Sequence, residues 1–163
     1  MSDAKHALEA LLKTASAELG VPLELTDDNE CIISRADGQE LVLGAEDGDD
    51  MIWIFSPLIE AGHDAREQLF AWCLQENVVQ EHTKGAVIGF DVNTNRFLLS
   101  HRVHMSIASD GRLGQILSNL FDLTDTISRV ISEKQSELAH VSGASSTQSS
   151  ENQQSGPTHH GFA

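Results

Sequence analysis

Basic residues are scarce in this sequence: 10 Lys and Arg stand against 25 Asp and Glu, so the formal net charge is -15. No cluster of basic residues is available to neutralise phosphates, and the same charge would repel anionic lipid. The composition therefore argues against a protein that binds nucleic acid or a membrane surface. The expected partners are other proteins or something cationic.

Cysteine is also scarce, and long apolar runs are missing. Cys31 and Cys73 stand alone, without the paired spacing of a disulfide framework or a zinc finger. The N-terminal stretch MSDAKHALEALLKTA lacks the apolar core of a signal peptide or a membrane span. For a chain of 163 residues we therefore expect one main domain, located in the cytosol.

Sequence motifs of catalysis and of metal or cofactor binding are missing as well. The chain has no phosphate loop, nucleophile elbow or dinucleotide fingerprint, so we expect no cofactor. An acidic run at residues 46–50 resembles the start of a calcium loop, but the twelfth position counted from Asp47 is Leu58, where calcium needs a glutamate. The acidic run is better interpreted as a solvated turn. Near the C-terminus, the neighbouring residues His159 and His160 would bind only a stray metal ion.

The stretch from residue 86 to 104 predicts a β-hairpin, because apolar residues alternate on both sides of the turn-forming Asn93, Thr94 and Asn95. His101 and His104 lie near its end and raise the question of a metal or catalytic site. Residues three apart on a strand point to opposite faces, so these two side chains are not expected to meet. A small enzyme using His101 and His104 is the least favoured alternative.

The remaining pattern predicts an α+β fold with an antiparallel twisted sheet and three helices. A first helix, with apolar residues on one side from residue 4 to 19, precedes the strands VPLELT, ECIISRA, QELVLGAE and MIWIFSPL. A second helix is expected from about 64 to 79, and a third from about 110 after the hairpin. The predicted order is α-β-β-β-(β)-α-β-β-α over residues 1–141, and the polar segment 142–163 is predicted to be a disordered tail.

Two predicted elements carry more apolar surface than a single small domain readily covers. The second helix is apolar almost all the way round, which predicts either a central buried helix or, as we favour, a homodimer about a two-fold axis. The interface residues would be Leu69, Phe70, Trp72, Cys73, Leu74 and Val78. The strand at residues 51–55 is apolar on both faces, so its second face is either covered by the third helix or receives a segment of another protein.

The order of elements resembles the class I type III secretion chaperones, the family of the Tir chaperone, over residues 3 to 138. The resemblance is carried by ELGVPLELTDDNECIIS, DDMIWIFSPL, LFAWCLQENV and GAVIGFDVNTNRFLLSHRV. Its most specific part is the second helix ending in Asn77, followed by a hairpin that begins with glycine. The polar segment after residue 141 departs from the family pattern, and it would be either an added contact or a linker.

The resemblance implies an acidic cytoplasmic homodimer without ATPase activity. Such a chaperone binds the N-terminal segment of one or a few secreted effectors, keeps it extended and delivers it to the export apparatus, whose ATPase is a candidate further partner. Some relatives act instead as adaptors in gene regulation, and a purely structural dimeric module is a further alternative. In the family the second helix forms the dimer, and apolar strips on the first helix and sheet bind the effector. The corresponding effector-binding residues are Leu8, Leu12, Ile33, Leu43, Ile52, Ile54 and Phe55.

Overall fold

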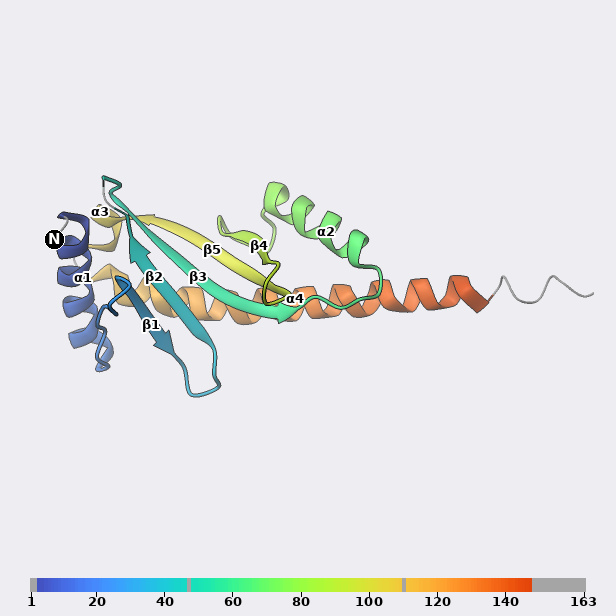
Figure 1. Cartoon of the computed structure of the whole chain (residues 1–163), viewed down its shortest axis with the longest axis horizontal. Coiled ribbons are helices and arrows are strands. Elements are labelled where there is room, and N and C mark those ends of the chain that lie inside the picture. Colours follow the sequence, from blue (N-terminus) through green and yellow to red (C-terminus); the bar gives the residue numbers. More distant parts are fainter. Residues whose placement is uncertain (1–2, 47, 110, 148–163) are drawn as a thin grey trace, which may run out of the picture.

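The computed structural model of the chain describes residues 3–46, 48–109 and 111–147, which form a five-stranded sheet with helices (Figure 1). In chain order the elements are α1 (Asp3–Leu19), β1 (Glu30–Ser34), β2 (Glu40–Ala45), β3 (Met51–Glu60), α2 (Arg66–Val79), β4 (Val87–Asp91), β5 (Arg96–His104), α3 (Met105–Ala108) and α4 (Arg112–Thr147). Within these residues no helix is both long enough and apolar enough to cross a membrane.

The sheet is antiparallel throughout, with the strand order β1-β2-β3-β5-β4. Its central strand is β3, and α2 with β4 is inserted between β3 and its neighbour β5. The predicted hairpin is confirmed, because β4 and β5 pair directly around the turn. Asp91 stabilises this turn by accepting hydrogen bonds from the amide of Asn93 (2.9 Å) and the hydroxyl of Thr94 (2.7 Å).

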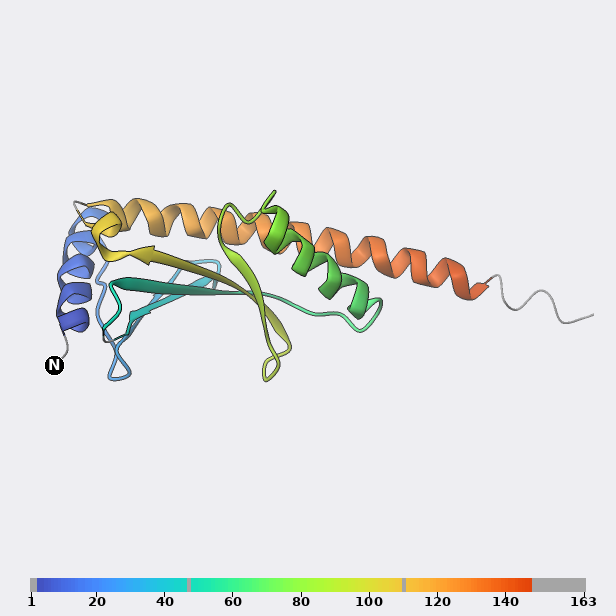
Figure 2. The ribbon, with the colours of Figure 1, turned by 90° about the horizontal axis from the view of Figure 1, so that it is seen from above.

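Helices α1 and α4 cover one face of the sheet, which is called the inner face below (Figure 2). The apolar side of α1 is buried against it at Leu8, Leu12 and Ala15, and the helix ends at Gly20, whose positive φ of 69° suits glycine. Helix α4 has 36 residues and packs against two hydrophobic clusters. One cluster joins α4 to α1 and the first three strands, and the other joins α4 to α2 and the β4–β5 hairpin.

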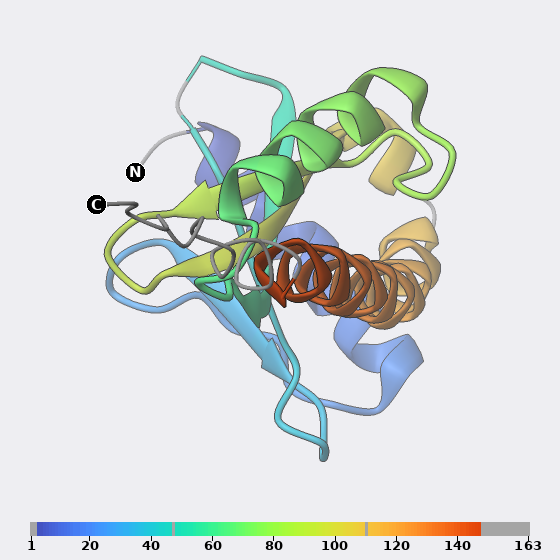
Figure 3. The ribbon, with the colours of Figure 1, turned by 90° about the vertical axis from the view of Figure 1, so that its right-hand side faces the viewer.

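Helix α2 lies at the other end of the sheet, next to β4 and α4 (Figure 3). Leu69 and Cys73 are its buried apolar contacts. Asn77, in its last turn, holds the helix to β4: its side-chain amide donates to the carbonyl of Ile88 (2.9 Å) and its side-chain oxygen accepts from the amide of Ile88 (2.7 Å). This asparagine therefore fixes where the hairpin begins relative to α2.

The structure differs from the sequence prediction at three places. Residues 22–26, part of the predicted strand VPLELT, pair with no strand, although Leu23 is buried as the alternation suggests. Alternation indicates an extended backbone but not a partner strand. A short helix, α3, precedes the final one because the ring nitrogen of His104 accepts a hydrogen bond from the amide of Ser106 and caps it (3.2 Å). Finally, α4 continues past the predicted boundary at residue 141 to Thr147, and residues 148–163 of the predicted tail lie outside the described residues.

Candidate functional site

The outer face of the sheet, opposite α1 and α4, carries an apolar surface that no described helix covers (Figure 2). On β3, Ile52 and Ile54 point inward and are buried, whereas Trp53 and Phe55 point outward. The centres of the Trp53 and Phe55 rings lie 5.3 Å apart. Trp53 also lies against Gly44, where an added Cβ would come within 2.2 Å of the indole ring. The glycine therefore lets this large ring lie flat on the sheet.

We call this surface the outer strip. Its apolar members come from three neighbouring strands: Val42, Trp53, Phe55, Pro57 and Leu98. Together they line a hollow of about 760 Å³. Acidic residues border it at Asp28, Glu30 and Glu46, and Arg102 lies at another side, 3.4 Å from Asp49. An apolar floor with a mainly acidic rim fits a chain segment that has apolar anchors and basic residues.

A second surface lies at the edge of the sheet, between β1, the end of α1 and α4. We call it the edge groove. It is a hollow of about 330 Å³, and the apolar residues exposed in it are Leu19, Val21 and Ile32. Because β1 pairs with β2 alone among the described strands, its other side leaves main-chain groups available to an added strand.

Arg35 and Phe121 close the edge groove beside α4. The Arg35 guanidinium lies over the Phe121 ring, 5.3 Å from its centre, and it pairs with Asp37 and, at 3.0 Å, with Asp125. The hydrogen bond from Arg35 is the main reason that the pKa of Asp37 is lowered. These contacts hold Arg35 in place, so its guanidinium is a fixed part of the groove wall.

A third exposed apolar surface runs along the outer side of α2. Ala71, Leu74 and Val78 are exposed and follow one another at helical spacing, with 67% of Leu74 and 83% of Val78 accessible. Val79 in the same helix and Val87 at the start of β4 are also exposed. We call the stripe of Ala71, Leu74 and Val78 the α2 stripe. Such a row of exposed apolar side chains is typical of an interaction surface.

The residues predicted for the dimer interface divide between the core and the surface. Leu69 and Cys73 are buried in the core of the single chain and do not lie on its surface, and burial raises the pKa of Cys73 to about 12. Phe70 and Trp72 are half-buried, and Phe70 packs edge-on against Phe90 with the ring centres 4.8 Å apart. Only Leu74 and Val78 of the six are fully on the surface. The apolar pattern of α2 thus combines an inner and an outer face.

Most residues predicted to bind the effector lie in the core of the single chain. The five at most 2% exposed are Leu8, Leu12, Leu43, Ile52 and Ile54. Ile33 is half-buried, and Phe55 is exposed on the outer strip. These residues are buried because α1 and α4 cover the inner face of the sheet. Since β3 is apolar on both faces, its sequence does not indicate which face is covered. The prediction missed Trp53, Pro57 and Leu98; the parity of β3, which puts Trp53 with Phe55, was the available signal.

The two histidines of the hairpin do not form a shared site. His101 points inward and is half-buried, and burial is the main reason that its pKa is lowered, although a hydrogen bond to the backbone of Gly85 opposes this shift. His104 is exposed and caps α3. The two side chains therefore lie on opposite faces, as strand parity predicts. Of the two, the structure gives His104 a local structural role as the cap of α3.

Comparisons with solved structures identify the fold. A chain of the HopA1–SchA chaperone–effector complex is similar with a TM-score of 0.56 at 14% identity, covering 86% of this chain and 98% of the other. A chain of the ExsC–ExsE complex is similar with a TM-score of 0.63 at 16% identity, covering 80% and 97%. A chain of the complex of the Yersinia pestis type III secretion chaperone SycH with a fragment of YscM2 gives 0.54 at 17% identity, covering 72% and 97%.

Comparison of sequences identifies the family. A search of curated proteins finds no match to this chain at a significant level. The sequence model of the Tir chaperone protein (CesT) family matches residues 10–127, which include every described strand, α2 and the beginning of α4 up to residue 127. The resemblance expected from the sequence is thereby confirmed. This chain belongs to the Tir chaperone protein (CesT) family.

Proposed function

We propose that this chain is a cytoplasmic type III secretion chaperone, which binds the N-terminal segment of one or a few secreted effectors and keeps it extended for export. Family membership supports this function, and the similar solved structures are described as chaperone–effector or related complexes. The observation that carries the proposal is the outer strip, an uncovered apolar hollow across three strands. The outer strip is not part of the buried core of the single chain, so its apolar side chains are available to a partner.

The outer strip and the edge groove together suit an extended segment. Apolar side chains of the segment would enter the strip, while its main chain pairs with the free side of β1. Fully burying one large apolar side chain contributes about 1.5–3 kcal/mol, and ordering each residue's backbone costs about 1–2 kcal/mol. Several anchors are therefore needed, which favours a long segment over a short peptide. This binding requires no covalent step and no catalytic residue.

Charge selects among the segments that carry enough apolar anchors. Asp28, Glu30 and Glu46 border the strip, in a protein with a net charge of -15. A segment with basic residues between its apolar ones is attracted to this rim, whereas an acidic segment is repelled. Because the rim is exposed, its main effects are a faster association and sensitivity to salt.

We further propose that two copies associate through the α2 stripe. A two-fold axis would bring the stripe of one protomer onto the same stripe of its partner, because such an interface is self-complementary. Leu74 and Val78 provide the exposed apolar area at its centre. The outer strip lies on the sheet, so each protomer could still bind its own part of an effector.

Binding by a purified effector segment tests the function. Effectors that co-purify with the chain from its native cytoplasm would be identified by mass spectrometry, and their N-terminal segments titrated by calorimetry. We expect Phe55→Asp on the outer strip to weaken binding at least tenfold. Val92→Asp, in the exposed β4–β5 turn away from the strip, is the matched control and should change binding less than twofold.

Two results would contradict the proposal. One is unchanged binding by a folded Phe55→Asp variant. The other is a segment that becomes helical and compact on the chaperone instead of staying extended, as judged by circular dichroism and protection from proteolysis.

A further inference from the structure

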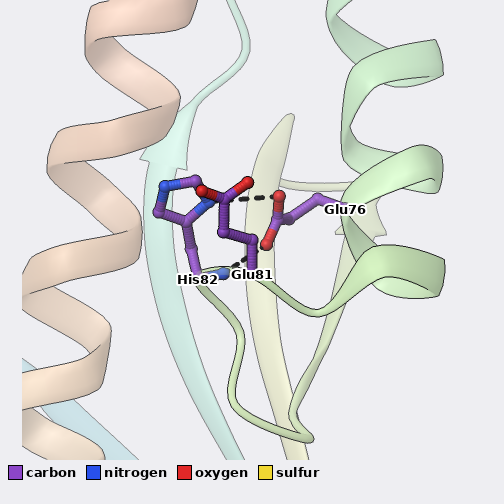
Figure 4. A group of neighbouring side chains, drawn as sticks. All are labelled: Glu76, Glu81 and His82. Atoms are coloured by element: carbon purple, nitrogen blue, oxygen red, sulfur yellow. Dashed lines mark hydrogen bonds and ion pairs between the residues drawn. The ribbon is translucent and has the colours of Figure 1, made fainter.

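The end of α2 and the loop that follows bring two carboxylates and an imidazole together (Figure 4). The residues are Glu76 in the last turn of the helix, and Glu81 and His82 in the loop. One ligand atom from each lies within 4.8 Å of the other two. Glu76 is only 5% exposed, His82 is half-buried, and Glu81 reaches the solvent. The three form a cluster that is open on one side.

Negative charge accumulates at this point. The C-terminal end of a helix carries a partial negative charge, and α2 has no basic residue in its last turn. Glu76 places a buried carboxylate there, and Glu81 adds a second. Lys84 is close by, but its ammonium group donates to the main-chain carbonyl of Glu81 (2.7 Å). A cation bound between the carboxylates would balance this charge.

Glu76 is held in its ionised form although it is buried. Burial by itself would raise its pKa, but the hydrogen bond from the amide of His82, the adjacent ring of His82 and the amide of Thr83 together outweigh it, so the pKa of Glu76 is lowered. The amide of His82 donates to Oε1 at 2.5 Å. The second oxygen, Oε2, faces the ring of His82.

The ring of His82 points its Nδ1 atom at Glu76. Nδ1 lies 3.1 Å from Oε2, yet it is shielded from solvent and has no hydrogen bond of acceptable geometry. When the imidazole is neutral with its lone pair on Nδ1, two acceptors face each other at this distance. Either a proton or a metal ion on Nδ1 removes this conflict, and the nearby Glu81 carboxylate favours the higher charge of a metal ion.

We infer that Glu76, Glu81 and His82 form a binding site for a divalent transition-metal ion, with Zn²⁺ as the best fit. One imidazole nitrogen and two carboxylate oxygens are donors that Zn²⁺ accepts, and a water molecule would complete a tetrahedron. Ligand atoms around tetrahedral Zn²⁺ are roughly 3.4 Å apart, so the side chains need to move inward by about an ångström. Glu81, on the exposed loop, has room for that movement.

The role of this site would be structural. Between α2 and β4 the chain passes through Gln80, Lys84 and Gly85, which all have positive φ values. A metal ion bound to Glu76 on the helix and to two loop residues would tie this turn to α2. It would also support the position of β4, whose start is already fixed to Asn77. The inference does not rest on the proposed chaperone function.

Zinc titration of the full chain tests the inference. His159 and His160 are adjacent in the sequence and could capture metal by themselves, so both are replaced by Gln in every protein compared. Each protein is freed of metal with a chelator and titrated with ZnCl₂ by calorimetry, and its thermal unfolding is followed with and without zinc. The cluster variants are Glu81→Gln and His82→Gln, and the control is His63→Gln, an exposed histidine outside the cluster.

We expect one Zn²⁺ per chain and a rise in Tm of roughly 5–10 °C at a zinc concentration 100 times the Kd. Each cluster variant should weaken zinc binding at least tenfold, whereas His63→Gln should change it less than twofold. Absence of saturable binding would overturn the inference. If a cluster variant does not fold, X-ray absorption of the zinc-loaded parent decides: sulfur ligands or several imidazoles would also overturn it.

Discussion

Leu69 and Leu74 are both apolar residues of α2 that the sequence assigns to one interface, and the structure separates them. Leu69 is 1% exposed and packs in the cluster of α2, the hairpin and α4, whereas Leu74 is 67% exposed. Replacing them tests this division of the helix into an inner and an outer face. The two substitutions should affect different properties of the protein.

Leu69→Ala should destabilise the folded chain. Removing a fully buried leucine side chain costs about 2–5 kcal/mol, because the lost apolar contacts leave a cavity. For a chain of this size, each kcal/mol lowers Tm by about 2–4 °C, so a decrease of roughly 4–20 °C is expected. Denaturation monitored by circular dichroism at several protein concentrations would measure it.

Leu74→Asp should instead weaken self-association. In a single chain this side chain is mostly in solvent, so the change in stability should stay within about 1 kcal/mol. In a symmetric dimer, the substitution would bury one unpaired carboxylate from each protomer, at a cost of several kcal/mol. A loss of 2.8 kcal/mol corresponds to about 100-fold in Kd. Sedimentation equilibrium would therefore show dimers for the parent and mainly monomers for the variant at micromolar concentration.

Val92→Asp is the control, because Val92 is also exposed, at 79%, but lies in the β4–β5 turn. A parent protein that sediments as a monomer at all concentrations would refute the dimer. A Leu74→Asp variant that dimerises as tightly as the parent would refute the assignment to the α2 stripe. A Leu69→Ala variant that dissociates without losing stability would show that the inner and outer faces were assigned the wrong way round.

Three further predictions concern β3, the histidines and the buried glutamate. Ile54→Ala should lower Tm by the same roughly 4–20 °C as Leu69→Ala, whereas Phe55→Asp should leave Tm nearly unchanged and weaken effector binding in a calorimetric titration. Replacing His101 and His104 together by Gln should leave effector binding within twofold of the parent, and a folded variant that loses binding would contradict this. The lowered pKa of Glu76 means that its ionised form stabilises the fold at neutral pH, and this contribution is lost as the pH falls through that lowered value. The free energy of unfolding, measured at a series of acidic pH values, should therefore change less with pH for Glu76→Gln than for the parent.

Local patterns predicted the elements of this fold well. Alternation around Asn93 and Asn95 identified the β4–β5 hairpin, and the 3.6-residue spacing from Leu8 to Leu19 identified α1. Both signals are local, because they depend on residues close in the sequence. His104 shows the limit of such signals, since strand parity placed its side chain correctly but did not indicate that it would cap a short helix.

Which face of the sheet is covered could not be predicted from the same patterns. Ile54 and Phe55 are neighbours in a strand that is apolar on both sides, and only the positions of α1 and α4 decide which of them is buried. That choice depends on contacts between residues far apart in the sequence. The cluster of Glu76 and His82 was missed for another reason: the left-handed Gln80 turns the loop back onto the helix, and no pattern in the sequence marks that turn.

The length of α4 has a consequence for how the protein unfolds. Leu117 of this helix belongs to the cluster with α1, Ile127 belongs to the cluster with α2, and Leu123 between them contacts both. If α4 detached from one half of the sheet, it would expose apolar residues of a continuous helix that also packs against the other half. Hydrogen exchange should accordingly find α1 and the β4–β5 hairpin opening in one cooperative unit, with the amides around Leu123 among the slowest to exchange.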